Sequence, residues 1–172
     1  MKVTLLEYPS ERDWMEVKRR ALVTVGKKPV SKPGPLWMDA ILRARHSPIR
    51  YLRFSFLLED IPSYVSVHLV RHIHAQPYVK SQRNDRQQEY DRTKAPQDAP
   101  VNMIWDMNAE ELMVIANKRL CNLADPVTQK AVRMMCAEVN TVCPEFRPHL
   151  VPMCKYLGGC NEMTPCGKAV EV

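Results

Sequence analysis

Residues 51–58, YLRFSFLL, carry the clearest structural pattern in this chain. Leu52, Phe54, Phe56 and Leu58 alternate with the other side chains. This period of two predicts a strand with one buried face. The next residues, EDIPS, combine two acidic side chains with a proline, and we expect the strand to end among them.

The residues before this strand predict another strand, two helices and a loop. Residues 1–8, MKVTLLEY, are typical of a short strand. Ser10 is an N-cap residue with Asp13 three positions later, and apolar side chains recur at helical spacing over residues 11 to about 25. A proline-rich loop follows, and PLWMDAILRAR, residues 35–45, predicts a second helix.

One segment after the strand is ambiguous. In SYVSVHLVRHIH, residues 63–74, the apolar side chains Val65, Val67 and Leu69 alternate as in a strand. Val65, Leu69 and His72 also fit one stripe of a helix. Periodicity therefore leaves both interpretations open.

Further along the chain, composition and capping residues predict a loop and two helices. Residues 82–97 are nearly devoid of apolar side chains, so we expect a solvent-exposed or ligand-facing loop there. Asn108 and Glu111 form a cap pairing at the start of one helix, and Asp125-Pro126 begins another.

The bulk composition predicts one compact domain that binds an anionic ligand. The chain has 172 residues, 45% of them hydrophobic, which is long enough for one core and short for two. We assign residues 1–172 to a single domain with a Cys-rich tail at 144–172. A net charge of +6 favours nucleic acid, nucleotides, folate polyglutamates and flavin phosphates, and charge alone does not distinguish among them.

The start of the chain and its apolar runs indicate the cellular compartment that we expect for the protein. No run reaches the roughly 18 to 20 continuous apolar residues that span a bilayer. The first residues turn charged before a signal-peptide core can form. We therefore expect a cytoplasmic protein with no membrane partner.

The cysteines are concentrated near the C-terminus. Five of the six follow residue 130, and Cys154, Cys160 and Cys166 recur at six-residue intervals. Structural zinc usually has more closely spaced cysteine pairs, so we expect unpaired thiols in a reducing compartment and no metal site. A zinc-stabilised interaction protein remains the alternative interpretation of this tail.

The segment RHIHAQPYVKSQR, residues 71–83, is the most informative for function. Several cationic or titratable side chains and the Ser81 hydroxyl lie between an apolar run and a polar loop, where they can converge on an anion. The rival interpretation is a nucleic-acid-binding module over residues 71–94. Its aromatic side chains are few, only Tyr78 and Tyr90, whereas single-strand binders interleave aromatic and basic residues.

The same segment resembles the signature of flavin-dependent thymidylate synthases. That signature is Arg-His-Arg, seven residues, Ser, and an Arg two residues later. Arg71, His72, Ser81 and Arg83 match it, whereas Ile73 replaces the third residue and its cation.

Two further blocks carry the same resemblance. RARHSPIRYLRFSF, residues 43–56, resembles the family's His-x-Ser/Thr-Pro stretch, with Ser47 and Pro48 matched and Arg45 where a flavin-contacting histidine is common. NAEELMVIANKRLC, residues 108–121, resembles the family's Asn-rich helix. The residues matched there are Asn108, Leu112, Asn117 and Arg119.

The resemblance covers roughly residues 36 to 123 and implies a fold and an assembly. It implies an α+β fold in which helices pack on a mixed or antiparallel sheet of one domain. It favours a helix over about residues 62–72. It also implies a homotetramer with active sites shared between subunits. A long helical segment of many family members is compressed here to about residues 93–107, TKAPQDAPVNMIWDM.

The resemblance also implies an activity. The family methylates dUMP to dTMP with methylenetetrahydrofolate as carbon donor, reduced FAD as reductant and NADPH as the usual source of electrons. An enzyme of this kind has small-molecule substrates and no nucleic-acid partner.

Residue roles follow from the matched positions. Catalytic roles are implied for Arg71 and Ser81. Substrate-binding roles are implied for Ser81, Gln82, Arg83, Arg119 and His68. Cofactor-binding roles are implied for Ser47, Arg71, His72, Ile73 and Asn108. Ser81 has no obvious base beside it in the sequence, so we expect it to bind the nucleotide first and to act in catalysis second.

Overall fold

The chain forms an α+β fold with one antiparallel sheet. The structure, a computed structural model, describes residues 1–81, 83, 91 and 93–168. Its four strands run in the order β1-β2-β4-β3, and every neighbouring pair is antiparallel. Their bounds are Lys2–Glu7 for β1, Arg53–Pro62 for β2, Gln76–Val79 for β3 and Pro100–Asn108 for β4. The expectation of a mixed or antiparallel sheet is thus resolved to antiparallel.

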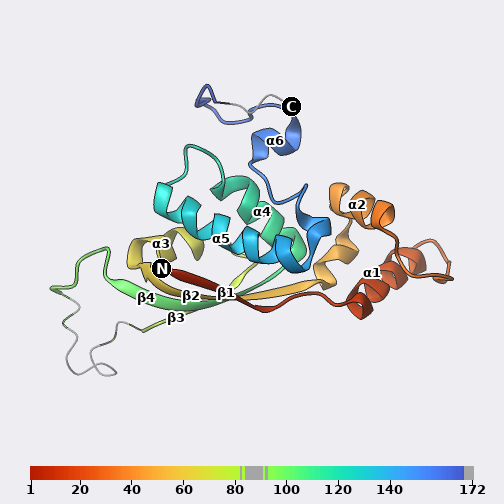
Figure 1. Cartoon of the computed structure of the whole chain (residues 1–172), viewed down its shortest axis with the longest axis horizontal. Coiled ribbons are helices and arrows are strands. Elements are labelled where there is room, and N and C mark those ends of the chain that lie inside the picture. Colours follow the sequence, from red (N-terminus) through yellow and green to blue (C-terminus); the bar gives the residue numbers. More distant parts are fainter. Residues whose placement is uncertain (82, 84–90, 92, 169–172) are drawn as a thin grey trace.

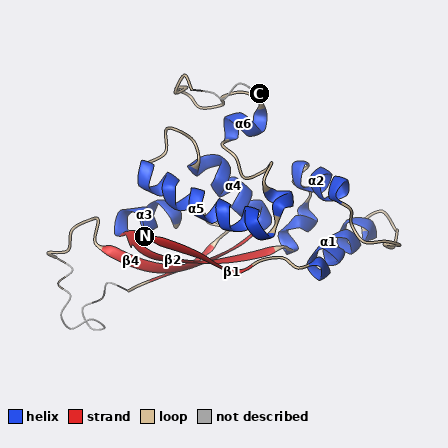
Figure 2. Cartoon of the chain, viewed as in Figure 1, coloured by secondary structure: helices blue, strands red, loops and turns tan. Residues whose placement is uncertain are grey.

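The helices lie on one side of this sheet. Their bounds are Glu11–Val23 for α1, Pro35–Arg43 for α2, Ser63–Leu69 for α3, Ala109–Arg119 for α4, Pro126–Val142 for α5 and Met153–Leu157 for α6. There are also two short 3-10 turns: η1 (Ser47–Tyr51) lies between α2 and β2, and η2 (Pro144–Phe146) lies between α5 and α6. Figure 1 shows α3, α4 and α5 above the sheet, α1 and α2 at one end, and α6 with the tail farther out. Figure 2 shows the two layers by colour, with the strands below the helices.

The core forms between the sheet and this helical layer. Phe54, Phe56 and Leu58 of β2 are fully or almost fully buried, as their alternation predicted. The Phe54 ring meets the Phe146 ring edge-on with centroids 5.2 Å apart. In the described part of the chain, no helix is long and apolar enough to cross a membrane.

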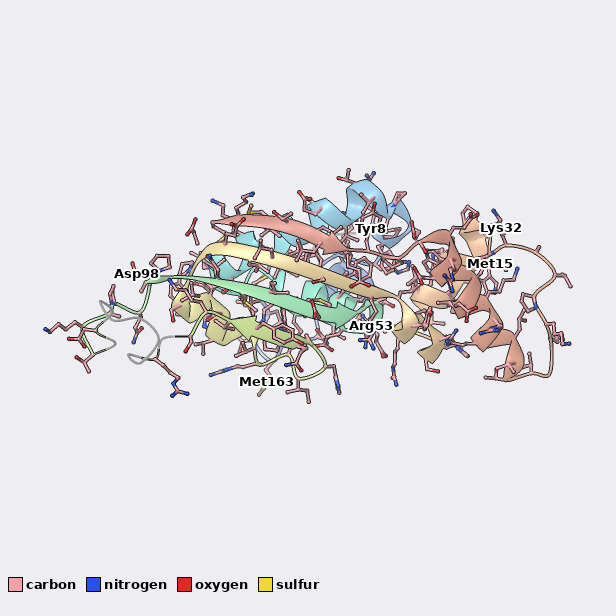
Figure 3. All side chains as sticks on the ribbon, turned by 90° about the horizontal axis from the view of Figure 1, so that it is seen from below. Tyr8, Met15, Lys32, Arg53, Asp98 and Met163 are labelled. Carbon is pink, nitrogen blue, oxygen red and sulfur yellow. The ribbon has the colours of Figure 1, made fainter. Side chains whose placement is uncertain are left out.

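The other face of the sheet is not covered by any described helix, as the view from below shows (Figure 3). Across it the register aligns Thr4 with Leu57, Leu57 with Ile104, and Ile104 with Tyr78. Strand β3 forms one edge of the sheet and contains Pro77.

Helix starts were predicted accurately because capping is a local interaction. Ser10 and Asp13 form a reciprocal capping box at α1. The Asn108 side chain accepts from the Glu111 amide at α4, and Asp125 accepts from the Thr128 amide at α5. The helix favoured for about residues 62–72 exists as α3, but it ends at Leu69.

Strand β4 corrects the sequence analysis, which placed a compressed helical segment at residues 93–107. Val101, Met103, Trp105 and Met107 alternate along β4 and all point into the core. This period of two is as regular as that of β2 and was sufficient to predict a strand. Strand β3 was also missed, since four residues containing a proline give little pattern.

Strand β2 ends within EDIPS, as expected. It passes through Glu59 and Asp60 and ends at Pro62. The pairing with β4 shifts between Leu58 and Ile61, and Asp60 has a left-handed φ of 52°. The Asn102 side-chain oxygen accepts from the Asp60 amide at 2.9 Å, so the bulge is stabilised by the neighbouring strand.

Truncations on the two faces of β4 should destabilise the protein to different extents. Trp105 is 0% exposed, so Trp105→Ala should lower the free energy of unfolding by about 3 to 5 kcal/mol. Ile104 on the opposite face is 39% exposed, and Ile104→Ala should lower it by about 1 kcal/mol or less. Urea denaturation at a fixed protein concentration measures both. Equal losses for the two variants would contradict the assigned faces of β4.

Candidate functional site

The turn after α3 brings the signature segment against α4. Helix α3 ends at Leu69, and residues 70–75 form turns that lead into β3. The His72 amide donates to the Leu69 carbonyl at 3.1 Å, which fixes this turn. Arg71 is exposed, whereas the His72 side chain is only 9% exposed and lies 6.1 Å, centroid to centroid, from the Trp105 ring.

His72 lies between two charged side chains of α4. Arg119 donates from Nε to His72 Nε2 at 3.0 Å. On the other side of the ring, His72 Nδ1 lies 3.4 Å from Glu111 Oε1. Glu111 is buried, with 5% exposure. The structure thus joins the signature segment to the Asn-rich helix through a buried polar contact.

Arg119 has further contacts with the signature region. Its Nη2 donates to the His68 carbonyl at 2.7 Å. Burial and, to a smaller extent, the positive charge of Arg71 lower the pKa of Arg119. Two guanidinium groups held close together repel one another, and an anionic or electron-rich ligand bound at both would relieve that repulsion.

The predicted substrate residue His68 points its ring toward α5. His68 Nδ1 lies 2.9 Å from the Thr128 hydroxyl, and its ring meets the Tyr64 ring at 5.8 Å. Its side chain therefore helps to pack α3 on α5, while its carbonyl holds Arg119.

The second half of the signature follows β3. Ser81 Oγ accepts from the Arg83 amide at 3.3 Å, which makes a local turn. Arg83 and Lys80 border an open hollow of about 290 Å³, together with Ser63, Ser66, Val67, Val79 and Val101. This hollow has two cations in its lining. Gln82, a predicted substrate residue, lies outside the described residues.

The predicted cofactor residues Ser47 and Asn108 lie near the starts of η1 and α4. Ser47 is exposed and is the first residue of η1. Asn108 caps α4 and borders a hollow of about 370 Å³, whose other lining residues are Arg50, His74, Glu110, Glu111 and Val114. Arg50 and Glu110, both in its lining, form an ion pair. Ile73, the remaining predicted cofactor residue, is 82% exposed.

Arg45 contacts other side chains of the protein. It donates to the Asn117 side-chain oxygen, and its guanidinium stacks 4.7 Å from the centre of the Tyr156 ring. Asn117 in turn donates to the Val151 carbonyl at 2.6 Å. Asn117 and Arg45, both within the resembling blocks, therefore attach the C-terminal tail to the core.

Four cysteines border one cavity of about 180 Å³ between the end of α4 and the tail; these are Cys121, Cys154, Cys160 and Cys166. All six cysteines of the chain are free thiols in this structure. Among the described residues, no three His, Cys, Asp or Glu side chains are placed so that they could hold a metal ion. The zinc-stabilised alternative thus receives no support from the described geometry.

The role of Glu111 was missed by the sequence analysis. That analysis treated Glu111 as a cap partner, but its carboxylate turns to His72 and only its amide takes part in the cap. A glutamate in the first turn of an amphipathic helix gives no signal that it will be buried. Its partner lies 39 positions earlier, beyond the reach of local pattern analysis.

Comparison with solved structures identifies the fold. Thymidylate synthase X from Helicobacter pylori, solved with FAD and dUMP, is similar with a TM-score of 0.66 and 15% sequence identity, covering 86% of this chain and 96% of that chain. The UMP/dUMP methylase PolB from Streptomyces cacaoi, bound with 5-Br dUMP, is similar with a TM-score of 0.68 and 15% identity, covering 87% of this chain and 96% of that chain. No protein-family model matches the chain, and no curated protein matches it by sequence. The fold is therefore that of flavin-dependent thymidylate synthases, as the sequence resemblance predicted.

The cysteines should differ sharply in reactivity. Burial raises the pKa of both Cys136 and Cys143 to about 12, whereas Cys160 is exposed. At about pH 8 the thiolate fraction of the two buried thiols is then on the order of a thousand-fold lower than that of an ordinary cysteine. Timed alkylation with iodoacetamide and peptide mass spectrometry should find Cys160 modified first. Modification of Cys136 in the folded protein at the rate of Cys160 would refute the assignment, with the denatured protein as control.

Proposed function

We propose that this protein is a flavin-dependent thymidylate synthase, which converts dUMP to dTMP with methylenetetrahydrofolate as carbon donor and reduced FAD as reductant. NADPH is the proposed source of electrons. One observation carries the proposal: the signature turn and the Asn-rich helix meet through the hydrogen bond from Arg119 Nε to His72 Nε2 at 3.0 Å. The fold shared with enzymes solved with dUMP, FAD or 5-Br dUMP supports it.

The nucleotide is proposed to bind between α4 and the end of β3. Arg71 and Arg119 lie near one another, and their cations suit the carbonyl oxygens of a pyrimidine on which negative charge develops. Ser81 and Arg83 lie ten and twelve positions after Arg71. Their hydroxyl and guanidinium groups suit the phosphate of the nucleotide. The hollow that Arg83 shares with Lys80 gives this phosphate site two cations.

Ser81 is assigned to binding before catalysis. Its hydroxyl oxygen accepts a hydrogen bond from the Arg83 amide at 3.3 Å. An amide N–H orients the hydroxyl but cannot accept its proton, so this contact does not activate Ser81 as a nucleophile. A hydroxyl oriented by a turn is well suited to donate to a phosphate oxygen.

The residues near Asn108 fit part of a flavin nucleotide. The lining of the 370 Å³ hollow offers hydrogen-bond donors from Arg50, His74 and Asn108, which suit the carbonyl and phosphate oxygens of FAD. Reduced FAD supplies the reducing electrons when it is bound. The hollow lies near the lower end of the range of about 300 to 1,000 Å³ that encloses drug-sized ligands, and FAD is larger than these.

This difference in size supports the proposed homotetramer. A single chain offers open hollows of about 290 and 370 Å³, one lined by Arg83 and the other by His74. Enclosing FAD, dUMP and a folate requires more surface than these provide, so we propose that each site is completed by a neighbouring subunit.

Ligand binding tests the proposed function directly. The purified protein should be yellow, or should become yellow with FAD, and should bind dUMP in isothermal titration calorimetry. UMP serves as a second nucleotide, because one similar structure is a UMP/dUMP methylase. Light scattering before and after FAD addition should give a mass above that of one 19.9 kDa chain. A colourless monomer that binds neither FAD nor dUMP would overturn the proposal.

Arg83 and Ser81 are predicted to act on the nucleotide rather than on the flavin. Loss of a charge-assisted contact costs about 1.5 to 3 kcal/mol, so Arg83→Ala should weaken dUMP binding roughly ten- to a hundred-fold. FAD affinity should change much less. Arg12→Ala on the exposed surface of α1 is the matched control and should bind dUMP normally. An Arg83→Ala protein that keeps its dUMP affinity and loses FAD would show that the residue roles are misassigned.

Ser81→Ala separates the two roles of the hydroxyl. A binding role predicts a higher dUMP requirement with turnover largely kept at saturating dUMP, because the flavin chemistry does not need the hydroxyl. A nucleophilic role predicts that turnover is lost at any dUMP concentration. Steady-state kinetics over a range of dUMP concentrations distinguishes them.

A further inference from the structure

We propose that Glu111 is a positioning residue: it holds the imidazole of His72 in one tautomer and, through His72, fixes the guanidinium of Arg119 toward the pyrimidine. This inference rests on the proposed function only where it names the pyrimidine. The arrangement of the three side chains follows from contacts within the chain.

The tautomer of His72 follows from its two neighbours. Arg119 Nε carries a hydrogen and donates to His72 Nε2 at 3.0 Å, so Nε2 must be the unprotonated nitrogen that accepts. A neutral imidazole then carries its proton on Nδ1. Nδ1 lies 3.4 Å from Glu111 Oε1, and a carboxylate is an acceptor for that proton.

The opposite tautomer is disfavoured on both sides of the ring. A hydrogen on Nε2 would point at the N–H of Arg119, and a bare Nδ1 would face the lone pairs of the Glu111 carboxylate. Because the His72 and Glu111 side chains are only 9% and 6% exposed, these repulsions would be poorly screened by water. Glu111 and Arg119 therefore favour the same tautomer from the two sides of the ring.

Glu111 is free for this task because Asn108 performs the capping. The Asn108 side chain accepts from the Glu111 amide at 3.0 Å, so the glutamate side chain does not have to return to the helix start. Its negative charge near the N-terminus of α4 is stabilised by the helix dipole. Burial of this carboxylate, at 5% exposure, is offset by the imidazole N–H of His72.

The result is an arginine held at two points. Glu111 and Arg119 lie eight residues apart, about 12 Å along the helix axis, and the His72 ring bridges them. Arg119 donates from Nε to His72 and from Nη2 to the His68 carbonyl. Within the part of the chain that the structure describes, no hydrogen bond is assigned to Nη1, which can therefore serve a ligand. This restraint reduces the side-chain entropy that Arg119 would lose when a nucleotide binds.

The first test needs neither dUMP nor FAD. Two-bond ¹H–¹⁵N spectra of histidine-labelled protein at about pH 8, where imidazole is ordinarily neutral, report the tautomer of each ring. We expect His72 as the Nδ1–H tautomer in the wild type and in Glu111→Gln, because the amide oxygen of glutamine also accepts. Glu111→Leu has a similar volume and no acceptor, so it should weaken this preference and leave only the contribution of Arg119. Assignment comes from His72→Gln, whose spectrum lacks the corresponding signals.

The second test measures the effect on dUMP. Glu111→Leu should weaken dUMP binding on the order of ten-fold in the wild-type background and have little effect in an Arg119→Ala background, because Glu111 acts through that arginine. Glu111→Gln should restore most of the affinity. Glu138→Gln, an exposed glutamate of α5, is the control for loss of a carboxylate and should bind dUMP normally.

Different results of the two tests would contradict the inference and the proposed function. The inference would be overturned if His72 were found as the Nε2–H tautomer in the wild type. An unchanged population of the Nδ1–H tautomer in Glu111→Leu would also overturn it. So would equal weakening of dUMP binding by Glu111→Leu with and without Arg119. Wild-type protein that shows the expected tautomer and does not bind dUMP would instead overturn the proposed function and its pyrimidine role for Arg119.

Discussion

The burial of one face of the sheet determines where the other elements of the molecule lie. Strands β2 and β4 are the central pair, and their inward side chains Phe54, Phe56, Met103 and Trp105 are almost fully buried beneath the helices. Because alternate residues of a strand face opposite sides, this burial fixes the register of both strands. Strand β4 continues directly into α4 at Asn108, so the register also determines where α4 begins.

Features that arise between near neighbours in the chain were predictable. The alternation around Phe54, the caps at Ser10, Asn108 and Asp125, and the spacing of Arg71, His72, Ser81 and Arg83 are all local patterns. The bulge at Asp60 was not predictable in this way, since Asn102 of another strand stabilises it. Nor was the burial of Glu111, which depends on a histidine brought across by the turn after α3. Strand β4 was missed for another reason. Its alternating residues were available in the sequence, but the family resemblance was followed instead of their alternation.

The site combines a rigid part and an open part. His72, Glu111 and Arg119 lie between β4 and α4, where packing and hydrogen bonds fix each side chain. Ser81 and Arg83 follow a short edge strand, and Arg83 borders an open hollow. This division suits a site in which a planar ring must be oriented closely while a phosphate needs charge more than precise geometry. The departures at Arg45 and Ile73 lie outside the rigid part, since Arg45 attaches the tail and Ile73 is exposed.

Pro77 has a consequence for how copies of this chain can meet. A sheet edge with free N–H and C=O groups can recruit a strand from another molecule, which leads to open-ended stacking. Here β3 is only four residues long, and Pro77 within it has no N–H to donate. This border of the sheet is therefore a poor template for strand addition. At this border, any contact between copies would fall to side-chain surfaces such as the row from Leu57 through Ile104 to Tyr78.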